Sequence, residues 1–150
     1  MKDIFNATTV QEFEARINQL SQNSTGQWGK MNVYQMLKHC TENEKMMLRQ
    51  KQYKRRFIGR LFGKMALNAS IKNEKPLDKN SPTHPDLKFT GTGDVEPLKQ
   101  LWVSLLKQYP TQQSIDYEGF IHPFFGKMDS TQISRFAYKH VDHHLRQFGV

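Results

Sequence analysis

The stretch DSTQISRFAYKHVDHHLRQFG, residues 129–149, decides the fold, because it carries an amphipathic helical pattern with its own start and stop. Asp129 followed by Gln132 has the spacing of a capping box, and Gly149 is a helix stop signal. If Ile133 is placed at 0° and each residue adds about 100°, His140 and His144 fall at about 340° and about 20°, in the centre of the apolar stripe. The polar residues that fall on the opposite face, which we expect to meet solvent, are Arg135, Lys139, Asp142 and Arg146.

Four further helical patterns precede this one, over residues 8–23, 32–50, 58–69 and 95–109. Each carries apolar residues at helical steps, the stripe that an amphipathic helix buries. Thr9 with Glu12, and Asn32 with Gln35, are the capping-box pairs expected to begin the first two helices. Residues 70–94 contain three prolines and no sustained period, which predicts a long surface loop between the third and fourth helical segments. Strand patterns are almost absent, so the helices must bury their stripes against one another in an all-α bundle.

Length and composition favour a single domain, residues 1–150. A chain of this size can bury a core without disulfides, and its single cysteine, Cys40, excludes an intramolecular disulfide framework and a Cys-rich metal site. No segment approaches the roughly 20 apolar residues of a membrane-spanning helix. The stretch 1–17 lacks the apolar core of a signal peptide. We therefore expect a cytoplasmic protein.

The positive charge of the chain is confined to one segment. The formal net charge is +8, yet nine of the 22 basic residues lie within residues 45–72, where no acidic residue occurs. The rest of the chain holds 13 basic against 14 acidic residues, so only this basic segment carries an excess of positive charge.

A third histidine, His39, belongs to the helix predicted over residues 32–50, where it lies at the edge of the apolar face. If this helix runs antiparallel to the last one, His39 comes level with a position near 141, between His140 and His144. The last two histidines form an H-x-x-x-H pair, which places two imidazoles one turn apart on one face. Three imidazoles at one level can share a metal ion, provided that the two helices are antiparallel neighbours.

Three segments of the sequence carry a resemblance to a known family: WGKMNVYQMLKH (28–39), NSPTHPDLKFTGTGD (80–94) and HPFFGKMDSTQISRFAYKHVDHHLRQFG (122–149). Together they are similar to an uncharacterised-domain family of the DinB-like superfamily, and they span nearly the whole chain. The resemblance implies a four-helix bundle in which one His of the second helix and an H-x-x-x-H pair of the last hold a divalent metal ion. In this sequence the implied ligands are His39, His140 and His144, with zinc or nickel as the expected ion. Characterised relatives include thiol S-transferases and thiol-dependent isomerases, whereas this branch has no settled activity to carry over.

Three neutral imidazoles leave at least one open position on an ion, which is typical of a catalytic rather than a closed structural site. Water or a thiolate could occupy that position, and the resemblance then implies a thiol transferase or hydrolase that acts on a small molecule. The H-x-x-x-H segment contains no Glu, so a general base must come from elsewhere, and Glu44 and Asp142 are candidates by proximity in sequence. The alternative for the three histidines is a hydrogen-bonded core cluster.

Three other residues have a structural and a functional interpretation. Cys40 falls on the apolar face of its helix, which favours a buried, inert thiol over a nucleophile. His143 and His122 are candidates for the rim or the outer shell of a metal site, although a structural or exposed role is expected of each.

A second class of function rests on the basic segment, residues 45–72. Its lysines and arginines lie among aromatic residues and could contact nucleic acid, anionic lipid or a protein partner without any catalysis. No known nucleic-acid fold signature is present, and a solvated helix face is the structural alternative. A basic rim that guides an anionic cosubstrate would combine both functions. The sequence also leaves open whether the chain forms a homodimer.

Overall fold

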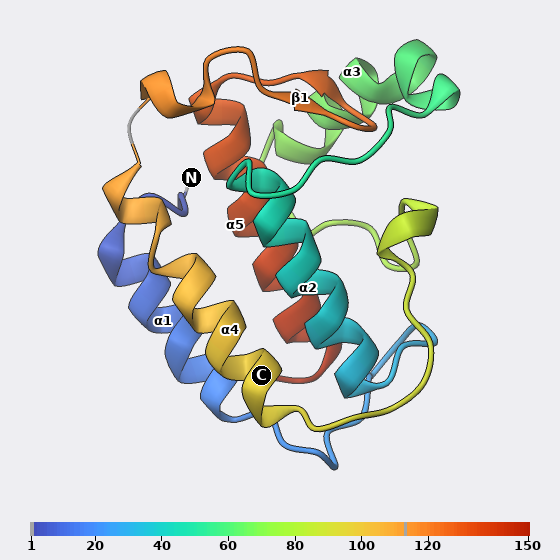
Figure 1. Ribbon diagram of the computed structural model, residues 1–150, viewed down its shortest axis with the longest axis vertical. Helices are drawn as coiled ribbons and strands as arrows, with labels where there is room; N and C mark the ends of the chain where they lie inside the picture. The colour runs from blue at the N-terminus through green and yellow to red at the C-terminus, as the bar shows by residue number, and fades with distance from the viewer. Residues whose placement is uncertain (1, 113) are drawn as a thin grey trace.

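The chain forms five α-helices and a small antiparallel strand pair in the computed structural model, which describes residues 2–112 and 114–150 (Figure 1). The α-helices are Ala7–Asn18 (α1), Val33–Met47 (α2), Phe57–Ile71 (α3), Glu96–Leu106 (α4) and Ser130–Gln147 (α5). Short 3-10 helices cover Pro85–Leu87 (η1), Tyr109–Thr111 (η2) and Ser114–Tyr117 (η3). The strands are Ile121–His122 (β1) and Gly126–Lys127 (β2). The molecule is therefore mostly helical, as the sequence patterns predict, with a strand pair that they do not predict.

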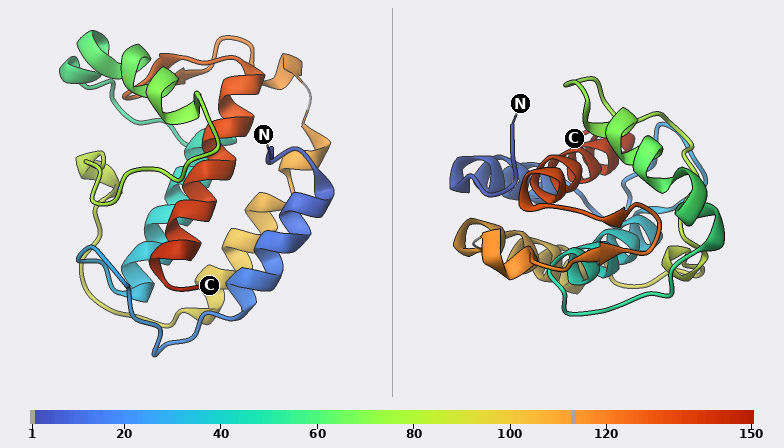
Figure 2. Two further views of the ribbon diagram at one scale, coloured as in Figure 1. Left: turned by 180° about the vertical axis from the view of Figure 1, so that it is seen from behind. Right: turned by 90° about the horizontal axis from the view of Figure 1, so that it is seen from above.

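Four of the helices, α1, α2, α4 and α5, pack against one another around the hydrophobic core. Contacts join α1 to α4 and α5, and join α2 to the same two helices. Seen from above, α1 and α5 form one layer, and α2 and α4 form the other (Figure 2). Figure 1 shows that α2 and α5 run in opposite directions. The antiparallel arrangement that would bring His39 level with the last two histidines is therefore present.

Capping boxes begin α2 and α5, as their sequences predict. The side chain of Asn32 accepts the backbone N–H of Gln35 at 2.9 Å, and the Gln35 side chain accepts the Asn32 N–H at 3.1 Å. The Asp129 and Gln132 pair repeats this exchange at 2.8 and 3.3 Å. Each box satisfies two of the four backbone donors that a helix start leaves free, and so fixes where the two histidine-bearing helices begin.

The start of α1 differs from the prediction. Its N-cap is Asn6, whose side chain accepts the backbone N–H of Thr8 at 2.8 Å. Thr9 instead lies inside the helix, where it is buried, so the expected capping box of Thr9 and Glu12 is wrong. Asn ranks above Thr as a cap, and the earlier start adds a turn to the helix.

The prediction that the third helix buries its apolar stripe is also wrong, because the residues of this stripe face solvent. Ile58, Leu61, Phe62 and Met65 are 57, 64, 49 and 67% exposed, respectively. The residues that α3 buries are Gly59, Gly63, Leu67 and Ile71. The two glycines let the helix backbone lie directly against the loop between β1 and β2, where a Cβ on either would collide with the carbonyl oxygen of Phe124. Close backbone packing at the two glycines, together with the burial of Leu67 and Ile71, therefore sets the orientation of α3.

Two residues of α5 that were expected to face solvent are buried. Lys139 is 5% exposed, and its amino group donates to the backbone oxygen of Ser70, just before the end of α3. Asp142 is 7% exposed and accepts hydrogen bonds from Arg16 at 2.8 Å and from Arg146 at 2.6 Å. Because α1, α2 and α3 all contact α5, this helix keeps little of the polar face that a simple wheel assigns to it.

The long connection predicted between the third and fourth helical segments is present and contains only η1 as regular structure. It passes beside α2, which η1 contacts. Among the described residues, no helix has both the length and the apolar character required to cross a membrane.

Candidate metal centre

The structure brings His39 of α2 together with His140 and His144 of α5, inside the packed helices. One ring nitrogen from each histidine lies within 4.8 Å of the other two. The Nε2 atoms of His39 and His140 are 3.1 Å apart, and none of the three side chains is more than 8% exposed. A tetrahedral ion with bonds of about 2.0–2.1 Å holds its ligand nitrogens about 3.4 Å apart. The cluster is therefore close to the size that one ion needs.

Two of the three rings have their protons fixed by neighbouring groups. The Nδ1 of His39 lies 3.0 Å from the backbone oxygen of Leu87, which can only accept, so this nitrogen carries the proton. The Nδ1 of His144 lies 2.9 Å from Oε1 of Gln147, whose Nε2 donates to the backbone oxygen of Trp28 at 2.9 Å. That second bond fixes the orientation of the Gln147 amide. Both rings therefore keep the lone pair of Nε2, the atom through which each can bind a metal.

The partner of His140, the side-chain amide of Asn43, can either donate or accept a hydrogen bond. Its Nδ1 lies 3.3 Å from Nδ2 of Asn43, which donates in this orientation and leaves the proton on Nε2 of His140. That proton points toward the free Nε2 of His39 and makes a direct hydrogen bond between the two histidines. If the Asn43 amide turns over, its oxygen accepts from Nδ1, and Nε2 of His140 becomes a metal ligand. The same residues can thus form a hydrogen-bonded cluster or an ion site.

Burial keeps all three histidines in the neutral form that metal binding requires. Loss of solvent lowers the pKa of His39, and it lowers the pKa values of His140 and His144 well below the ordinary range. Repulsion between the neighbouring imidazoles adds to this effect at His140 and His144. At neutral pH the cluster therefore offers nitrogen lone pairs instead of positive charge.

The two carboxylates considered as general bases are engaged elsewhere. Glu44 is fully buried, and the hydroxyl group of Tyr109 donates to it. Burial raises the pKa of Glu44 to about 7. Asp142 is held by its two arginine partners, Arg16 and Arg146. Neither carboxylate belongs to the three-histidine group, although Glu44 also hydrogen-bonds Asn43, the residue that contacts His140.

His122 and His143 have structural contacts of their own. His122 is buried, and its Nδ1 accepts the backbone N–H groups of Phe124 and Phe125 at 3.1 and 3.2 Å, which organises the turn between β1 and β2. Burial lowers its pKa to about 3. His143 is half-buried, and its ring meets the edge of Trp28 with centroids 5.7 Å apart. It lies beside His144 without belonging to the three-histidine group.

Cys40 is buried, as the sequence predicts, with its Sγ 3.6 Å from Sδ of Met36. Burial raises the pKa of this thiol well above its usual range. The neutral thiol is a poor nucleophile and a poor metal ligand, so Cys40 acts as part of the core.

Asn43 and Gln147 were not identified from the sequence, although both support the cluster. Gln147 lies three residues after His144 on the same helix, a spacing that places the two side chains side by side. That spacing could have identified it. Asn43 reaches His140 across the interface of two helices, and the Leu87 oxygen belongs to a backbone turn, so neither contact has a sequence signal.

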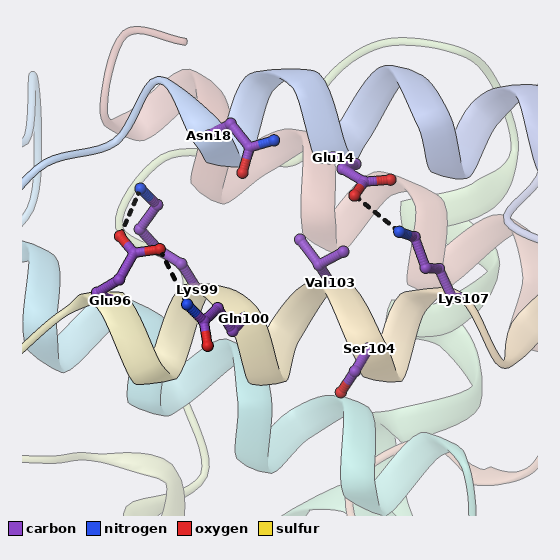
Figure 3. Close-up of a pocket in the computed structure, with 8 residues that line it drawn as sticks. All are labelled: Glu14, Asn18, Glu96, Lys99, Gln100, Val103, Ser104 and Lys107. Carbon is purple, nitrogen blue, oxygen red and sulfur yellow. Dashed lines mark hydrogen bonds and ion pairs between the residues drawn. The ribbon is translucent and has the colours of Figure 1, made fainter.

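A surface groove of about 280 Å³ between α1 and α4 lies apart from the cluster (Figure 3). Its charged groups pair with one another, since Lys107 contacts Glu14 at 2.7 Å and Lys99 contacts Glu96 at 3.1 Å. The first ion pair links α4 to α1, and the second lies within one turn of α4. The charged groups that line the groove therefore have a structural role.

Comparisons with known proteins place the chain in a family. Searches of the curated proteins and of the solved structures give no match. The model of a family described as "Protein of unknown function (DUF1569)" matches residues 4–149, which is nearly the whole chain. The chain therefore belongs to the DUF1569 family.

Proposed function

We propose that the protein binds one divalent metal ion, zinc or nickel, through His39, His140 and His144. We further propose that it uses this ion to transfer a thiol to a small electrophilic molecule or to hydrolyse that molecule. In this proposal the four packed helices are the bundle of a DinB-like protein, and the small-molecule substrate is the partner of the site.

The observation that carries the proposal is the set of groups bonded to the three histidines. The Leu87 oxygen and the Gln147 amide hold two rings in the tautomer whose Nε2 is free, and Asn43 can do the same for the third. A hydrogen bond from the far nitrogen of each ligand is the usual outer shell of a histidine metal site. A hydrogen-bonded core cluster would also need partners for its buried nitrogens, so the support for an ion lies in the convergence of these held rings, one nitrogen from each within 4.8 Å of the others.

Each residue has a defined part in the proposed site. His39 and the α5 pair would hold the ion, which would supply a Lewis acid and lower the pKa of a bound water or thiol. His140 retains 8% exposure, the largest of the three, so we propose that a small molecule approaches on its side. The surrounding apolar core keeps bulk water away and strengthens electrostatic interactions at the site.

Metal content measured by plasma mass spectrometry on untagged protein tests the ligand assignment. We expect about one equivalent in the wild type and almost none in His144→Ala. His143→Ala is a matched control, because it removes the adjacent imidazole on the same helix and should leave the metal in place.

Full metal content in a His39→Ala/His140→Ala double variant would show that the ligand assignment is wrong. Absence of metal from the wild type, even after reconstitution with zinc and with nickel, would favour the hydrogen-bonded cluster. If metal binds as expected, a screen of thiols against small electrophiles tests the reaction, and a loss of turnover in His144→Ala but not in His143→Ala would assign it to the ion.

A further inference from the structure

The exposed side of α3 is apolar over residues 57–65, the first nine of its fifteen residues. Five of its residues are between 49 and 74% exposed and make up what we call the α3 face: Phe57, Ile58, Leu61, Phe62 and Met65. With about 100° per residue, they fall within an arc of about 140°. Figures 1 and 2 show α3 at the edge of the molecule, beyond the four packed helices, so this face points away from the core. Soluble monomers seldom expose a contiguous apolar patch of this kind without a binding role.

Positive charge borders the α3 face at its start and along one side. Lys54, Arg55 and Arg56 immediately precede the helix, and Arg60 and Lys64 lie along one side of the face, all of them exposed. The whole stretch from 45 to 72 contains no acidic residue that could neutralise them. An apolar stripe bordered by lysines and arginines is the composition of a helix that lies in the interface of an anionic membrane.

The start of α3 adds to this charge. The first turn contains no acidic residue, and no side chain caps the helix. Arg56 is the N-cap, so three cations stand at the positive end of the helix dipole, where anions are normally favoured. This arrangement is unfavourable for the isolated protein, and a surface of phosphates would relieve it.

A groove beside the start of α3 is also lined by basic and apolar residues. It has a volume of about 250 Å³, and Arg49, Lys51 and Arg55 line it together with Ile121, which is 59% exposed. Lys51 is paired there with Glu42 at 2.5 Å, and Arg49 donates to the backbone oxygens of Asp116 and Glu118. Arg55 and the apolar edge are therefore the parts of the groove that a phosphate-bearing headgroup next to the helix would contact.

Two other occupants fit the α3 face less well. A second copy that paired through the same face would bring two sets of five cations together without intervening acidic groups. Nucleic acid would satisfy the cations but would leave five large apolar side chains without a matching surface.

From charge complementarity and apolar exposure together, we propose that α3 docks this protein onto a membrane surface that contains anionic phospholipids. The α3 face would lie among the upper acyl chains, and the surrounding lysines and arginines would contact the lipid phosphates. This inference uses none of the histidines and is independent of the proposed metal chemistry.

Flotation of the full-length protein with lipid vesicles tests this proposal. One set of vesicles contains phosphatidylcholine alone, and in the other a third of the lipid is phosphatidylglycerol. We expect binding to the second set and its decrease as NaCl is added. Leu61→Asp should abolish flotation, and Arg60→Glu/Lys64→Glu should reduce the partition coefficient at least about tenfold, because each basic residue contributes about 1 kcal/mol at an anionic surface.

Lys30→Glu/Lys75→Glu is the matched control, because it makes the same change in net charge at exposed positions outside the basic segment. It should float nearly like the wild type. Since all substituted side chains are exposed, thermal unfolding followed by circular dichroism should show that each variant is folded.

Four results would overturn the proposal. The first is the absence of flotation with anionic vesicles. The second is flotation that Leu61→Asp leaves unchanged. The third is binding that inorganic phosphate removes completely while NaCl at the same ionic strength does not, which would reveal an anion site without membrane docking. The fourth is a lipid-free dimer, detected by analytical ultracentrifugation, that Leu61→Asp dissociates, since the α3 face would then belong to a second copy.

Discussion

At the scale of single residues, the orientation of the Asn43 amide determines whether the three histidines form a hydrogen-bonded cluster or an ion site. Asn43 is 3% exposed, so its amide is removed from bulk solvent and needs hydrogen-bond partners in the interior. An ion at the cluster would select the orientation in which the amide oxygen accepts from His140. The affinity for metal should therefore depend on a residue that is not itself a ligand.

Substitution of Asn43 tests this dependence. Asn43→Leu removes the acceptor for Nδ1 of His140, and we expect the dissociation constant for zinc to rise by about 10–100-fold. Asn43→Asp supplies an acceptor that cannot donate, so it should bind zinc at least as tightly as the wild type. Competition with a chromogenic chelator measures both constants, and Asn68→Leu, at an exposed position of α3, is the control. Equal affinity in wild type and Asn43→Leu would contradict this role.

Glu44 makes stability depend on pH. Its pKa rises from 4.5 to about 7 on folding because the carboxyl group is fully buried. Between these values the folded state keeps a proton that the unfolded state has released, so the free energy of unfolding falls as pH rises and levels off above about pH 7. The whole change amounts to about 3 kcal/mol.

Glu44→Gln should remove this component, since the amide does not titrate and its oxygen can still accept from the Tyr109 hydroxyl. We expect the stability of the variant relative to wild type to increase by about 3 kcal/mol between pH 4.5 and pH 7.5. Urea unfolding at a series of pH values measures this difference and cancels the titration of the buried histidines, which both proteins share. If the free energies of unfolding of the two proteins changed in parallel with pH, Glu44 would not be the source of the pH dependence.

At the scale of elements, α3 shows that the side of a helix that is buried need not be its most apolar side. Gly59 and Gly63 bring its backbone against Phe124, whereas bulky residues occupy the exposed side. In an isolated helix, Ala in place of Gly is favourable by about 0.8–1.0 kcal/mol. Here the added methyl group would meet a backbone carbonyl that cannot rotate away, so the tertiary contact should outweigh the helix propensity.

Gly63→Ala should accordingly destabilise the protein by about 1–3 kcal/mol. The hairpin of β1 and β2 would have to move to accommodate the methyl group. Asn68→Ala, on the exposed side of the same helix, should be neutral or slightly stabilising, because it changes propensity without a contact. Chemical denaturation compares the two variants, and a stabilised Gly63→Ala would show that the close packing of α3 is not required.

At the scale of the whole molecule, the histidine cluster connects parts of the chain that are distant in sequence. His39 and His140 are 101 residues apart, and the Leu87 oxygen adds a contact from the long loop. A bound ion would thus stabilise the packing of α2, α5 and η1 together. It would favour the folded state by mass action, because the unfolded chain holds these histidines far apart.

Thermal unfolding should report this linkage. With free zinc at about 100 times the dissociation constant, we expect about 2.7 kcal/mol of added stability, which raises Tm by roughly 5–11 °C. His140→Ala should show no such increase, whereas His143→Ala should respond like the wild type. Scanning calorimetry with and without a chelator provides the measurement. A shift of equal size in His140→Ala would place the ion elsewhere.

The sequence by itself determined the elements whose signals are local. Capping residues fixed the starts of α2 and α5, prolines and the absence of a period marked the loop of residues 70–94, and the H-x-x-x-H spacing brought His140 and His144 onto one buried face. The level of His39 also followed from counting residues, once an antiparallel arrangement was assumed. These predictions succeeded because hydrogen bonds at a helix start and side-chain directions along a helix depend mainly on neighbours in the chain, although at α1 a competing local cap, Asn6, replaced the predicted Thr9.

The tertiary structure alone decided which faces are buried and which partners the buried groups find. The stripe of Ile58, Leu61, Phe62 and Met65 has the periodicity of a core face, yet it is exposed because the glycine side of α3 fits its neighbour more closely. Asp142 is buried by Arg16 of another helix, and Asn43 meets His140 only across an interface. Hydrophobic periodicity shows that a helix has an apolar side, but complementary shape and charge between distant segments determine whether that side is buried.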